Sequence, residues 1–256
     1  MSPGKKKKKK MKFSVVIPAH NEEGCVGSTL DKLTEKLDAS PFDYEIVVVA
    51  DHCSDDTEKI VAERAARNKR VVMVRNEKTP GFGMAVRAGL DAYTGDAVAI
   101  FMADASDSPD DLLAYFEKTA EGAECVFGSR FIKGGRVVDY PKHKLILNRI
   151  GNLIIRVLFQ HGLNDTTNAF KCYRREVIDG CRPFLSPHFN LTVEIPLKAA
   201  IRGYEYVIIP ISWTNRTTGV SKLKLKEMGS RYFFIILYCL LEKWMVSKDY
   251  RRKDAG

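Results

Sequence analysis

The chain alternates short apolar runs with longer amphipathic segments from residue 13 onward. The apolar runs are rich in β-branched residues, and in chain order they are FSVVI at 13–17, EIVVVA at 45–50, VVMV at 71–74, AVAIFMA at 97–103 and CVFG at 125–128. The segments between these runs repeat their apolar residues with a helical period. This predicts helices over about 22–38, from about 55 onward, over 83–93 and over 109–121. Near-continuous apolar strands linked by helices indicate an α/β fold with a mostly parallel sheet covered on both faces.

Polar residues follow the first two predicted strands. Ligands of such sheets bind beyond the carboxyl ends of the strands, so these positions are candidates for a site. Asn21 and Glu22 follow the first strand, although Asn21 can also cap the next helix. Asp51 follows the second strand directly, and an unpaired carboxylate at this edge is typical of a binding site. The turn at 81–85 contains two glycines and could offer N–H groups to a phosphate or merely form the turn.

An aspartate-rich stretch follows the fourth predicted strand. Asp110 and Asp111 come after Pro109 and fit the first turn of a helix. Asp104 and Asp107 come off a buried strand, where two neighbouring carboxylates repel each other unless a cation lies between them. Oxygen ligands of this kind select Mg²⁺ or Mn²⁺. We therefore favour a metal site over a solvated acidic turn.

The composition is that of one large globular domain. The 256 residues are 45% apolar and 29% charged, with a formal charge of +9. Six of the positive charges come from Lys5–Lys10, so the basic balance is largely local. This run reads as a solvated tail or a polybasic membrane anchor, and the lack of accompanying apolar residues favours the tail. The six cysteines have no C-x-x-C spacing, which fits a reducing compartment and argues against a zinc site.

An ordered series of motifs resembles the inverting family 2 glycosyltransferases of the GT-A fold, and within them the dolichol-phosphate mannose synthase type. The motifs are PAHNE at 18–22, ADHCSDDT at 50–57, GFGMA at 81–85, MADASD at 102–107, GSR at 128–130, NRIGN at 148–152, DTTNAF at 165–170 and RTTGVSKL at 216–223. The resemblance covers roughly residues 12–245. It implies a nucleotide-diphospho-sugar transferase fold with a C-terminal amphipathic helix.

The resemblance also implies roles for particular residues. On the donor side, the residues that would line the nucleotide pocket are Pro18, Asn21, Glu22 and Asp51, and those on a late loop that closes over the donor are Arg216, Ser221 and Lys222. The metal ligands would be Asp104, Ser106 and Asp107. On the acceptor side, Arg130 and Arg149 would hold a phosphate, with Asn152 and Asp165 beside it.

Three positions depart from the family pattern. The family's metal motif is usually Asp-x-Asp, and here Met102 occupies the position of the first Asp. Ser106 falls where a further ligand is often Gln, and Asp107 could compensate. Ala50 replaces the first acid of the usual Asp-Asp pair, so the nucleotide contacts there depend on Asp51.

The reaction implied is transfer of mannose or glucose from a GDP- or UDP-linked donor to a polyprenyl or dolichyl phosphate at the cytoplasmic membrane face, with no nucleic acid partner. A lipid phosphate is already an anion, so catalysis requires positioning and charge neutralisation rather than a base. An alternative acceptor, a sugar hydroxyl, would need a general base such as Glu194 or Asp165. Glu194 could equally face a cationic neighbour. A catalytically impaired nucleotide-sugar-binding homologue is a further alternative, whereas an NAD-type Rossmann enzyme is disfavoured because no G-x-G-x-x-G follows the first strand.

Two segments point to a membrane. Basic and apolar residues alternate over 142–161, as in an interfacial helix, and a ten-residue apolar run covers 232–241. About 20 apolar residues are needed to span a bilayer, so the second segment could lie in the interface but not cross it. Packing of both segments against the catalytic domain or a second subunit is the alternative. We favour the membrane, because the resemblance places Arg149 of the first segment at the acceptor phosphate. We expect a basic leader over 1–11, a catalytic domain over 12–230 and a membrane-associated helix with a basic tail over 231–256.

Overall fold

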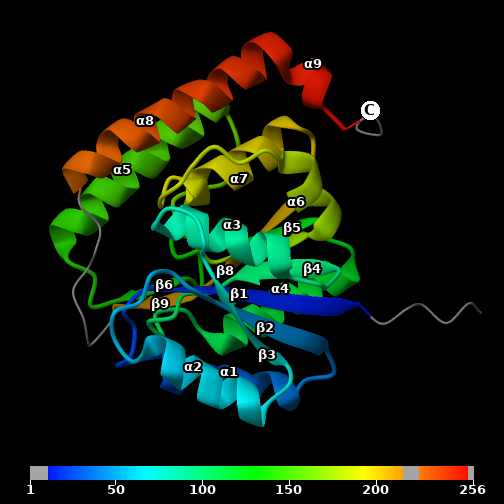
Figure 1. Cartoon of the computed structure of the whole chain (residues 1–256). Helices are drawn as coiled ribbons and strands as arrows, with labels where there is room; N and C mark the ends of the chain where they lie inside the picture. Colours follow the sequence, from blue (N-terminus) through cyan, green and yellow to red (C-terminus); the bar gives the residue numbers. More distant parts are fainter. Residues whose placement is uncertain (1–10, 216–224, 253–256) are drawn as a thin grey trace, which may run out of the picture.

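The computed structural model describes residues 11–215 and 225–252 (Figure 1). A central sheet of seven strands runs in the order β3-β2-β1-β4-β7-β5-β8. Its strands are β1 (Lys12–Ala19), β2 (Asp43–Ala50), β3 (Val71–Arg75), β4 (Ala97–Ile100), β5 (Cys125–Ser129), β7 (Lys171–Arg174) and β8 (Tyr206–Pro210). All neighbours are parallel except β7, which is antiparallel to β4 and β5. The expected mostly parallel sheet is confirmed.

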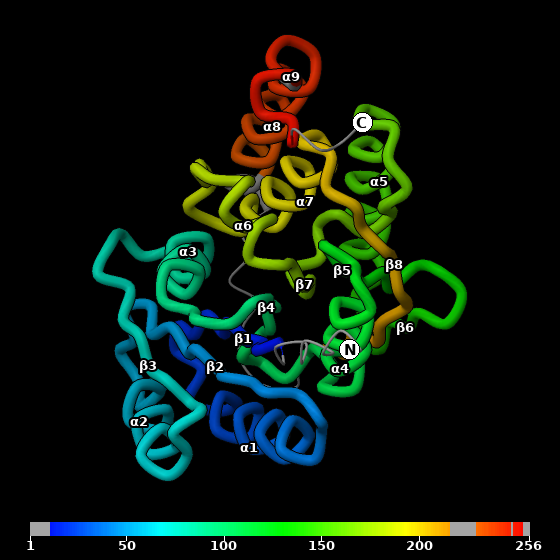
Figure 2. The backbone as a smooth tube through the Cα atoms, turned by 90° about the vertical axis from the view of Figure 1, so that its right-hand side faces the viewer, coloured from blue at the N-terminus to red at the C-terminus, as the bar shows by residue number. Residues whose placement is uncertain are grey.

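Helices cover both faces of the sheet, as Figure 2 shows. Alternate side chains of β1 point to opposite faces, because successive Cβ atoms of a strand alternate. Phe13, Val15 and Ile17 join the core under α1 (Val26–Asp38), α2 (Thr57–Arg67) and α4 (Pro109–Glu121). Val16 joins the core under α3 (Phe82–Ala92), α6 (Arg175–Cys181) and α7 (Leu191–Ile201). The strands read as continuous apolar runs because both of their faces are buried.

A third layer consists of two long helices on top of α7. These are α5 (Lys142–Phe159) and α8 (Leu225–Leu241), which continues into the π-helical η1 (Glu242–Val246) and into α9 (Ser247–Tyr250). Ile155 and Phe159 of α5 pack with Val193 of α7 and with Ile235 and Cys239 of α8. Helices were expected in both places, and α8 begins before the expected boundary at residue 231. No helix among the described residues has the length and apolar character to cross a bilayer.

A two-stranded sheet of β6 (Arg136–Val138) and β9 (Ser212–Thr214) lies beside the acidic turn that follows β4. Thr214 donates its backbone N–H to the Ser106 carbonyl at 3.1 Å, and Asp107 forms an antiparallel bridge with Trp213. The acidic turn is therefore held from the side by a strand that comes late in the chain.

Two ion pairs, one of them buried, tie the C-terminal segment to the catalytic domain. The guanidinium of Arg202 donates to both carboxylate oxygens of Glu242, at 2.7 and 3.0 Å, and each residue is only 2% exposed. Arg252 pairs with Glu124 and lies over the ring of Tyr204. Arg252 belongs to the basic tail that was expected beside the membrane-associated helix, and in the structure it contacts the protein itself.

Candidate active site

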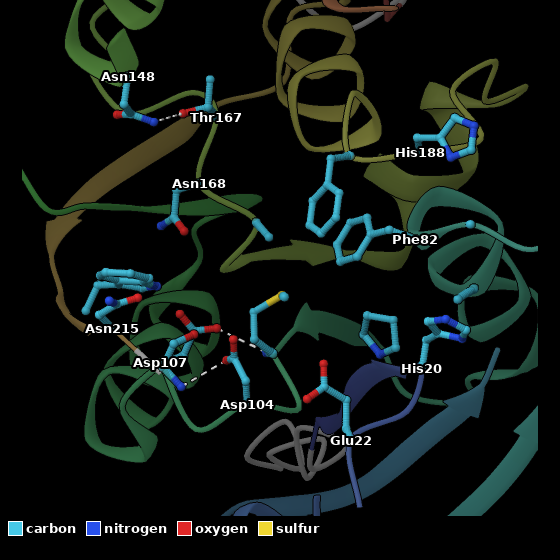
Figure 3. Close-up of a pocket in the computed structure, with 18 of the residues that line it drawn as sticks. His20, Glu22, Phe82, Asp104, Asp107, Asn148, Thr167, Asn168, His188 and Asn215 are labelled. Carbon is cyan, nitrogen blue, oxygen red and sulfur yellow. Dashed lines mark hydrogen bonds between the residues drawn. The ribbon is translucent and has the colours of Figure 1, made fainter. Parts of the chain in front are cut away.

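A cavity of about 790 Å³ opens at the carboxyl ends of β1, β2 and β4. Figure 3 shows Glu22, Asp104 and Asp107 at one end of it and Asn148 and Thr167 at the other. The first group comes from turns that follow strands, whereas Asn148 comes from α5. The cavity therefore connects the edge of the sheet to the helical layer.

Most of the predicted donor residues line this cavity. Pro18, Glu22 and Asp51 all do so, at the ends of β1 and β2. Asn21 does not belong to the lining, and its expected capping role is wrong because α1 begins only at Val26. Its side-chain oxygen instead accepts the backbone N–H of Ser54 at 2.8 Å. Asn21 thus joins the turn after β1 to the turn after β2.

Asp51 is a paired carboxylate, which corrects the expectation of an unpaired one. Its Oδ1 accepts a hydrogen bond from the Asn76 side chain at 2.7 Å, and its Oδ2 accepts one from the backbone N–H of Gly81 at 2.9 Å. These bonds fix the glycine-containing turn before α3 at the cavity wall. Gly81 has a φ of 154°, and an added Cβ would lie 2.6 Å from the Pro187 carbonyl oxygen, so a side chain does not fit there.

The acidic turn after β4 brings the three predicted metal ligands to the cavity. Asp104, Ser106 and Asp107 all line it. Asp104 accepts the Ser106 N–H at 3.1 Å, and Asp107 accepts the Met102 N–H at 3.1 Å. Burial and, as the next largest cause, the nearby Asp104 carboxylate together raise the pKa of Asp107 to about 7. The turn therefore contains a buried carboxylate whose ionised form has too few hydrogen bonds and nearby positive charges to offset the cost of its burial.

This turn meets the requirements of a Mg²⁺ or Mn²⁺ site only with help from a ligand. The described residues contain no group of three or more His, Cys, Asp and Glu side chains arranged around one metal position. Magnesium sites commonly use one or two carboxylates and complete the coordination with water and substrate phosphate. Asp104 and Asp107 fit that pattern, and a cation beside Asp107 would favour its ionised form.

Arg130 and Asp165 form a buried ion pair at the cavity wall. Nε of Arg130 donates to Asp165 Oδ2 at 2.8 Å, and one terminal nitrogen donates to Oδ1 at 2.7 Å. Asp165 is fully buried and does not belong to the cavity lining. Arg130 does line the cavity, within 6 Å of the rings of Tyr140 and Trp213. Asp165 therefore positions Arg130.

The two other predicted acceptor residues lie outside the cavity lining. Arg149 is exposed, and its guanidinium lies 4.4 Å from the ring centre of Phe131. Asn152 is 1% exposed, and its side chain bonds to Asn148 and to both the N–H and the hydroxyl of Thr167. Asn152 thus fixes α5 to the segment before β7.

Comparisons with known proteins identify the family. The model of glycosyl transferase family 2 matches residues 14–181, which is more than half of the chain. This chain belongs to glycosyl transferase family 2. It is therefore a glycosyltransferase, and its relatives place it among the dolichol-phosphate mannose synthase-like members.

Two relatives illustrate the similarity within this family. A polyprenol monophosphomannose synthase of Mycolicibacterium smegmatis is 30% identical over 225 residues, which cover 86% of this chain and 83% of that protein. A dolichol-phosphate mannosyltransferase of Pyrococcus furiosus is 30% identical over 223 residues, which cover 85% of this chain and 61% of that protein.

Solved structures confirm the GT-A fold of this family 2 enzyme. A glucosyl-3-phosphoglycerate synthase of Mycobacterium tuberculosis, crystallised with Mn²⁺, UDP and glucosyl-3-phosphoglycerate, superposes with a TM-score of 0.68. The match has 19% identity and covers 91% of this chain and 80% of that one. At this identity the likeness concerns the fold.

Glu194 is a structural residue of this glycosyltransferase. It is fully buried on α7, its carboxylate lies 2.7 Å from Nζ of Lys198, and it accepts the backbone N–H groups of Leu185 and Ser186 at 2.8 Å. It does not line the cavity. These bonds confirm the expectation that it faces a cationic neighbour and leave it out of reach as a general base.

Several lining residues were not found from the sequence. Lys144 and Asn148 of α5, Arg231 and Tyr232 of α8, and His188 and Phe189 before α7 all line the cavity. The spacing of residues 144, 148 and 152 places them on one face of α5, which was a signal in the sequence. The late-loop residues predicted to close over the donor, Arg216, Ser221 and Lys222, lie outside the described residues.

Proposed function

We propose that this glycosyltransferase moves a sugar from a nucleotide-diphosphate donor to a polyprenyl phosphate, with inversion, at the cytoplasmic face of a membrane. Mannose is the sugar we favour, because both relatives are named for mannosyl transfer. The observation that carries the proposal is the shape of the cavity. It begins at carboxylates suited to a metal and ends between two helices that carry exposed apolar side chains.

Exposed apolar side chains lie on two neighbouring helices, and we call them together the apolar face. On α5 it comprises Ile146, Leu147, Ile150, Leu153, Ile154 and Val157, and on α8 and η1 it comprises Phe233, Phe234, Leu237, Trp244 and Met245. Each of these residues is between 43% and 74% exposed. Figure 1 shows α5 and α8 side by side at the outer edge of the molecule. A large exposed apolar surface on helices that also carry basic residues is typical of an interfacial membrane contact.

The reaction that these residues support is a single displacement. Asp104 and Asp107 would hold Mg²⁺ or Mn²⁺, which when bound supplies charge neutralisation for the leaving diphosphate. Arg130, oriented by Asp165, offers a guanidinium to the acceptor phosphate at the cavity wall. That phosphate is anionic at neutral pH, so its oxygen attacks the anomeric carbon without a base.

A hydroxyl acceptor is the second candidate, and it needs a general base. The two carboxylates that the sequence offered for this role, Glu194 and Asp165, are both fully buried and outside the cavity lining. This favours a phosphate acceptor.

Radiolabelled GDP-mannose, GDP-glucose, UDP-glucose and UDP-mannose, each offered with polyprenyl phosphate or with soluble sugars, test the proposal. We expect label in the lipid fraction that depends on Mg²⁺ or Mn²⁺. Transfer only to a sugar hydroxyl would support the second candidate. Binding of nucleotide diphosphate without any turnover would indicate that Met102 and Ala50 have impaired catalysis.

A further inference from the structure

A buried lysine lies behind a turn that lines the cavity. Lys171 is 1% exposed and begins β7, the strand between β4 and β5 in the sheet. Its ammonium donates to the backbone carbonyl of Thr166 at 2.9 Å and to that of Asn168. These carbonyls belong to a turn over residues 165–168, in which Thr167 and Asn168 line the cavity. The ammonium therefore holds together a turn of the cavity wall from behind.

This lysine differs from other buried cations of the protein. Lys198 and Arg202 are buried in ion pairs with Glu194 and Glu242, whereas Lys171 forms no ion pair with any residue that the structure describes. Burial lowers the pKa of Lys171 to about 7. A buried cation without a paired carboxylate is costly, and an apolar side chain at this position of the strand would avoid that cost. What the lysine contributes in return is its pair of bonds to the turn.

The turn over residues 165–168 connects two parts of the cavity wall. Asp165 accepts hydrogen bonds from the guanidinium of Arg130 at 2.8 and 2.7 Å. The hydroxyl of Thr167 accepts hydrogen bonds from two amides of α5, Asn148 at 2.8 Å and Asn152 at 3.0 Å, and Figure 3 shows the first of them. Side chains 165 and 167 thus bind the arginine and the helix, while carbonyls 166 and 168 bind the buried ammonium.

We propose that Lys171 is a positioning residue for the acceptor, because it fixes the turn that orients Arg130 and anchors α5. This inference rests on the proposed function, in which Arg130 contacts the acceptor. Loss of the ammonium leaves the carbonyls of Thr166 and Asn168 without their donor, so the turn relaxes and the guanidinium and α5 move with it. The carboxylates on the donor side lie on other turns, after β1, β2 and β4, and keep their places.

Steady-state kinetics of Lys171→Met, with Arg175→Met as the matched control, test this role. The guanidinium of Arg175 also bonds to backbone carbonyls, those of Gly95 and Tyr93, but these precede β4, at the end of that strand away from the cavity. Misplacement of a group at a reacting centre by about 1 Å can cost a factor of about 10². We expect Lys171→Met to lower kcat/KM for polyprenyl phosphate by about tenfold to a hundredfold, with the donor KM unchanged. Arg175→Met should lower the melting temperature without this loss.

A double-mutant cycle shows whether Lys171 acts through Arg130. Arg130→Lys removes the two-pronged contact with Asp165, so the orientation of the guanidinium no longer counts. In that background Lys171→Met should cost a much smaller factor in kcat/KM for the acceptor than in the wild-type enzyme. Two losses that simply multiply would mean that the residues act independently, and would overturn the inference. Should Lys171→Met not fold, Lys171→Gln, which keeps a donor for one carbonyl, takes its place in both comparisons.

The outcomes also distinguish this inference from the proposed function. If the wild-type enzyme uses polyprenyl phosphate while Lys171→Met behaves like Arg175→Met, or loses donor and acceptor binding alike, the positioning role is wrong and the proposed function stands. If the wild-type enzyme uses only a sugar hydroxyl, the proposed function is wrong. The same two variants, assayed with that acceptor, then decide the role of Lys171: a loss specific to the acceptor supports it, and its absence overturns it.

Discussion

Two regions meet at the cavity, and they hold their polar groups in different ways. On the sheet side, Asp51, Asp104 and Asp107 lie on tight turns and accept backbone N–H groups from nearby turns. On the helical side, Lys144 and Arg231 lie on long helices whose positions depend on side-chain packing between α5, α7 and α8. One region is acidic and locally fixed, and the other is basic and fixed by tertiary contacts.

This difference indicates how each region should respond to mutation. A carboxylate on a turn can change without moving its backbone, because the strands beneath it are fully buried and paired. A residue that supports the helical layer changes the distance between the two walls. We therefore expect substitutions on the sheet side to reduce catalysis while the fold is retained. Substitutions beneath the helices should reduce stability first.

The largest effect on stability should come from Glu194→Gln under the helical layer. It leaves the ammonium of Lys198, which is fully buried, without its ionic partner. Breaking a buried ion pair from one side costs about 3–5 kcal/mol. Urea denaturation measures the loss. Glu121→Gln, which removes an exposed partner of Lys118, is the control and should cost at most about 1 kcal/mol. A Glu194→Gln enzyme with wild-type stability but no activity would make Glu194 a chemical residue after all.

On the sheet side, Asp104→Asn should reduce kcat by about 10² to 10³, the range seen when one group that stabilises transition-state charge is lost. The thermal melt should stay unchanged, because asparagine can also accept the Ser106 N–H that Asp104 accepts. Asp110→Asn is the control, since Asp110 belongs to the same aspartate-rich stretch but does not line the cavity. Persistence of transfer and of its cation requirement in Asp104→Asn would exclude a metal at this position.

The apolar face predicts a smaller effect that concerns only the membrane. Complete burial of a large apolar side chain contributes about 1.5–3 kcal/mol. Leu153→Ser and Phe234→Ser, at positions 58% and 59% exposed, should each weaken binding to phospholipid vesicles by about tenfold and leave the melting temperature unchanged. Val72→Ser, 42% exposed on β3, is the matched control. Equal vesicle binding by all three variants would mean that another part of the chain contacts the membrane.

The last prediction concerns the dependence of stability on pH at Asp107. Burial raises the pKa of this carboxyl from 3.8 to about 7, so between these values the native state keeps a proton that the unfolded chain releases. The free energy of unfolding therefore decreases as pH rises through that window, by at most about 1.4 kcal/mol per pH unit for one proton. Asp107→Asn should flatten this slope in metal-free urea denaturation curves. An unchanged slope would show that Asp107 does not titrate there.

The sheet was predictable from the sequence because its parallel strands are buried on both faces. β1, β2, β3 and β5 lie close to where the apolar runs placed them. The apolar run at 97–103 extends three residues beyond β4, because Phe101 and Ala103 are buried although they belong to the turn. β7 was missed because its sequence, KCYR, has charged ends, and Lys171 is buried through bonds to the carbonyls of Thr166 and Asn168. No local sequence pattern predicts the burial of this lysine.

The candidate site was predictable on the sheet side and only in part on the helical side. The carboxyl ends of parallel strands share one edge, so Glu22, Asp51 and Asp104 could be placed together before the fold was known. The rotation of α5 about its axis depends on tertiary packing. Arg149 was chosen by resemblance, whereas the inward face of the helix carries Lys144 and Asn148.

The pairing of Arg202 with Glu242 bears on any attempt to shorten this enzyme. Trimming the protein after α8 to improve solubility would remove the exposed apolar side chains of Trp244 and Met245. Such a truncation would also remove Glu242. The guanidinium of Arg202, at the end of α7 and beside the Gly180 carbonyl, would then be buried without its counter-ion. The segment after α8 therefore supplies the counter-ion of a buried arginine, and the enzyme is best produced with this segment attached.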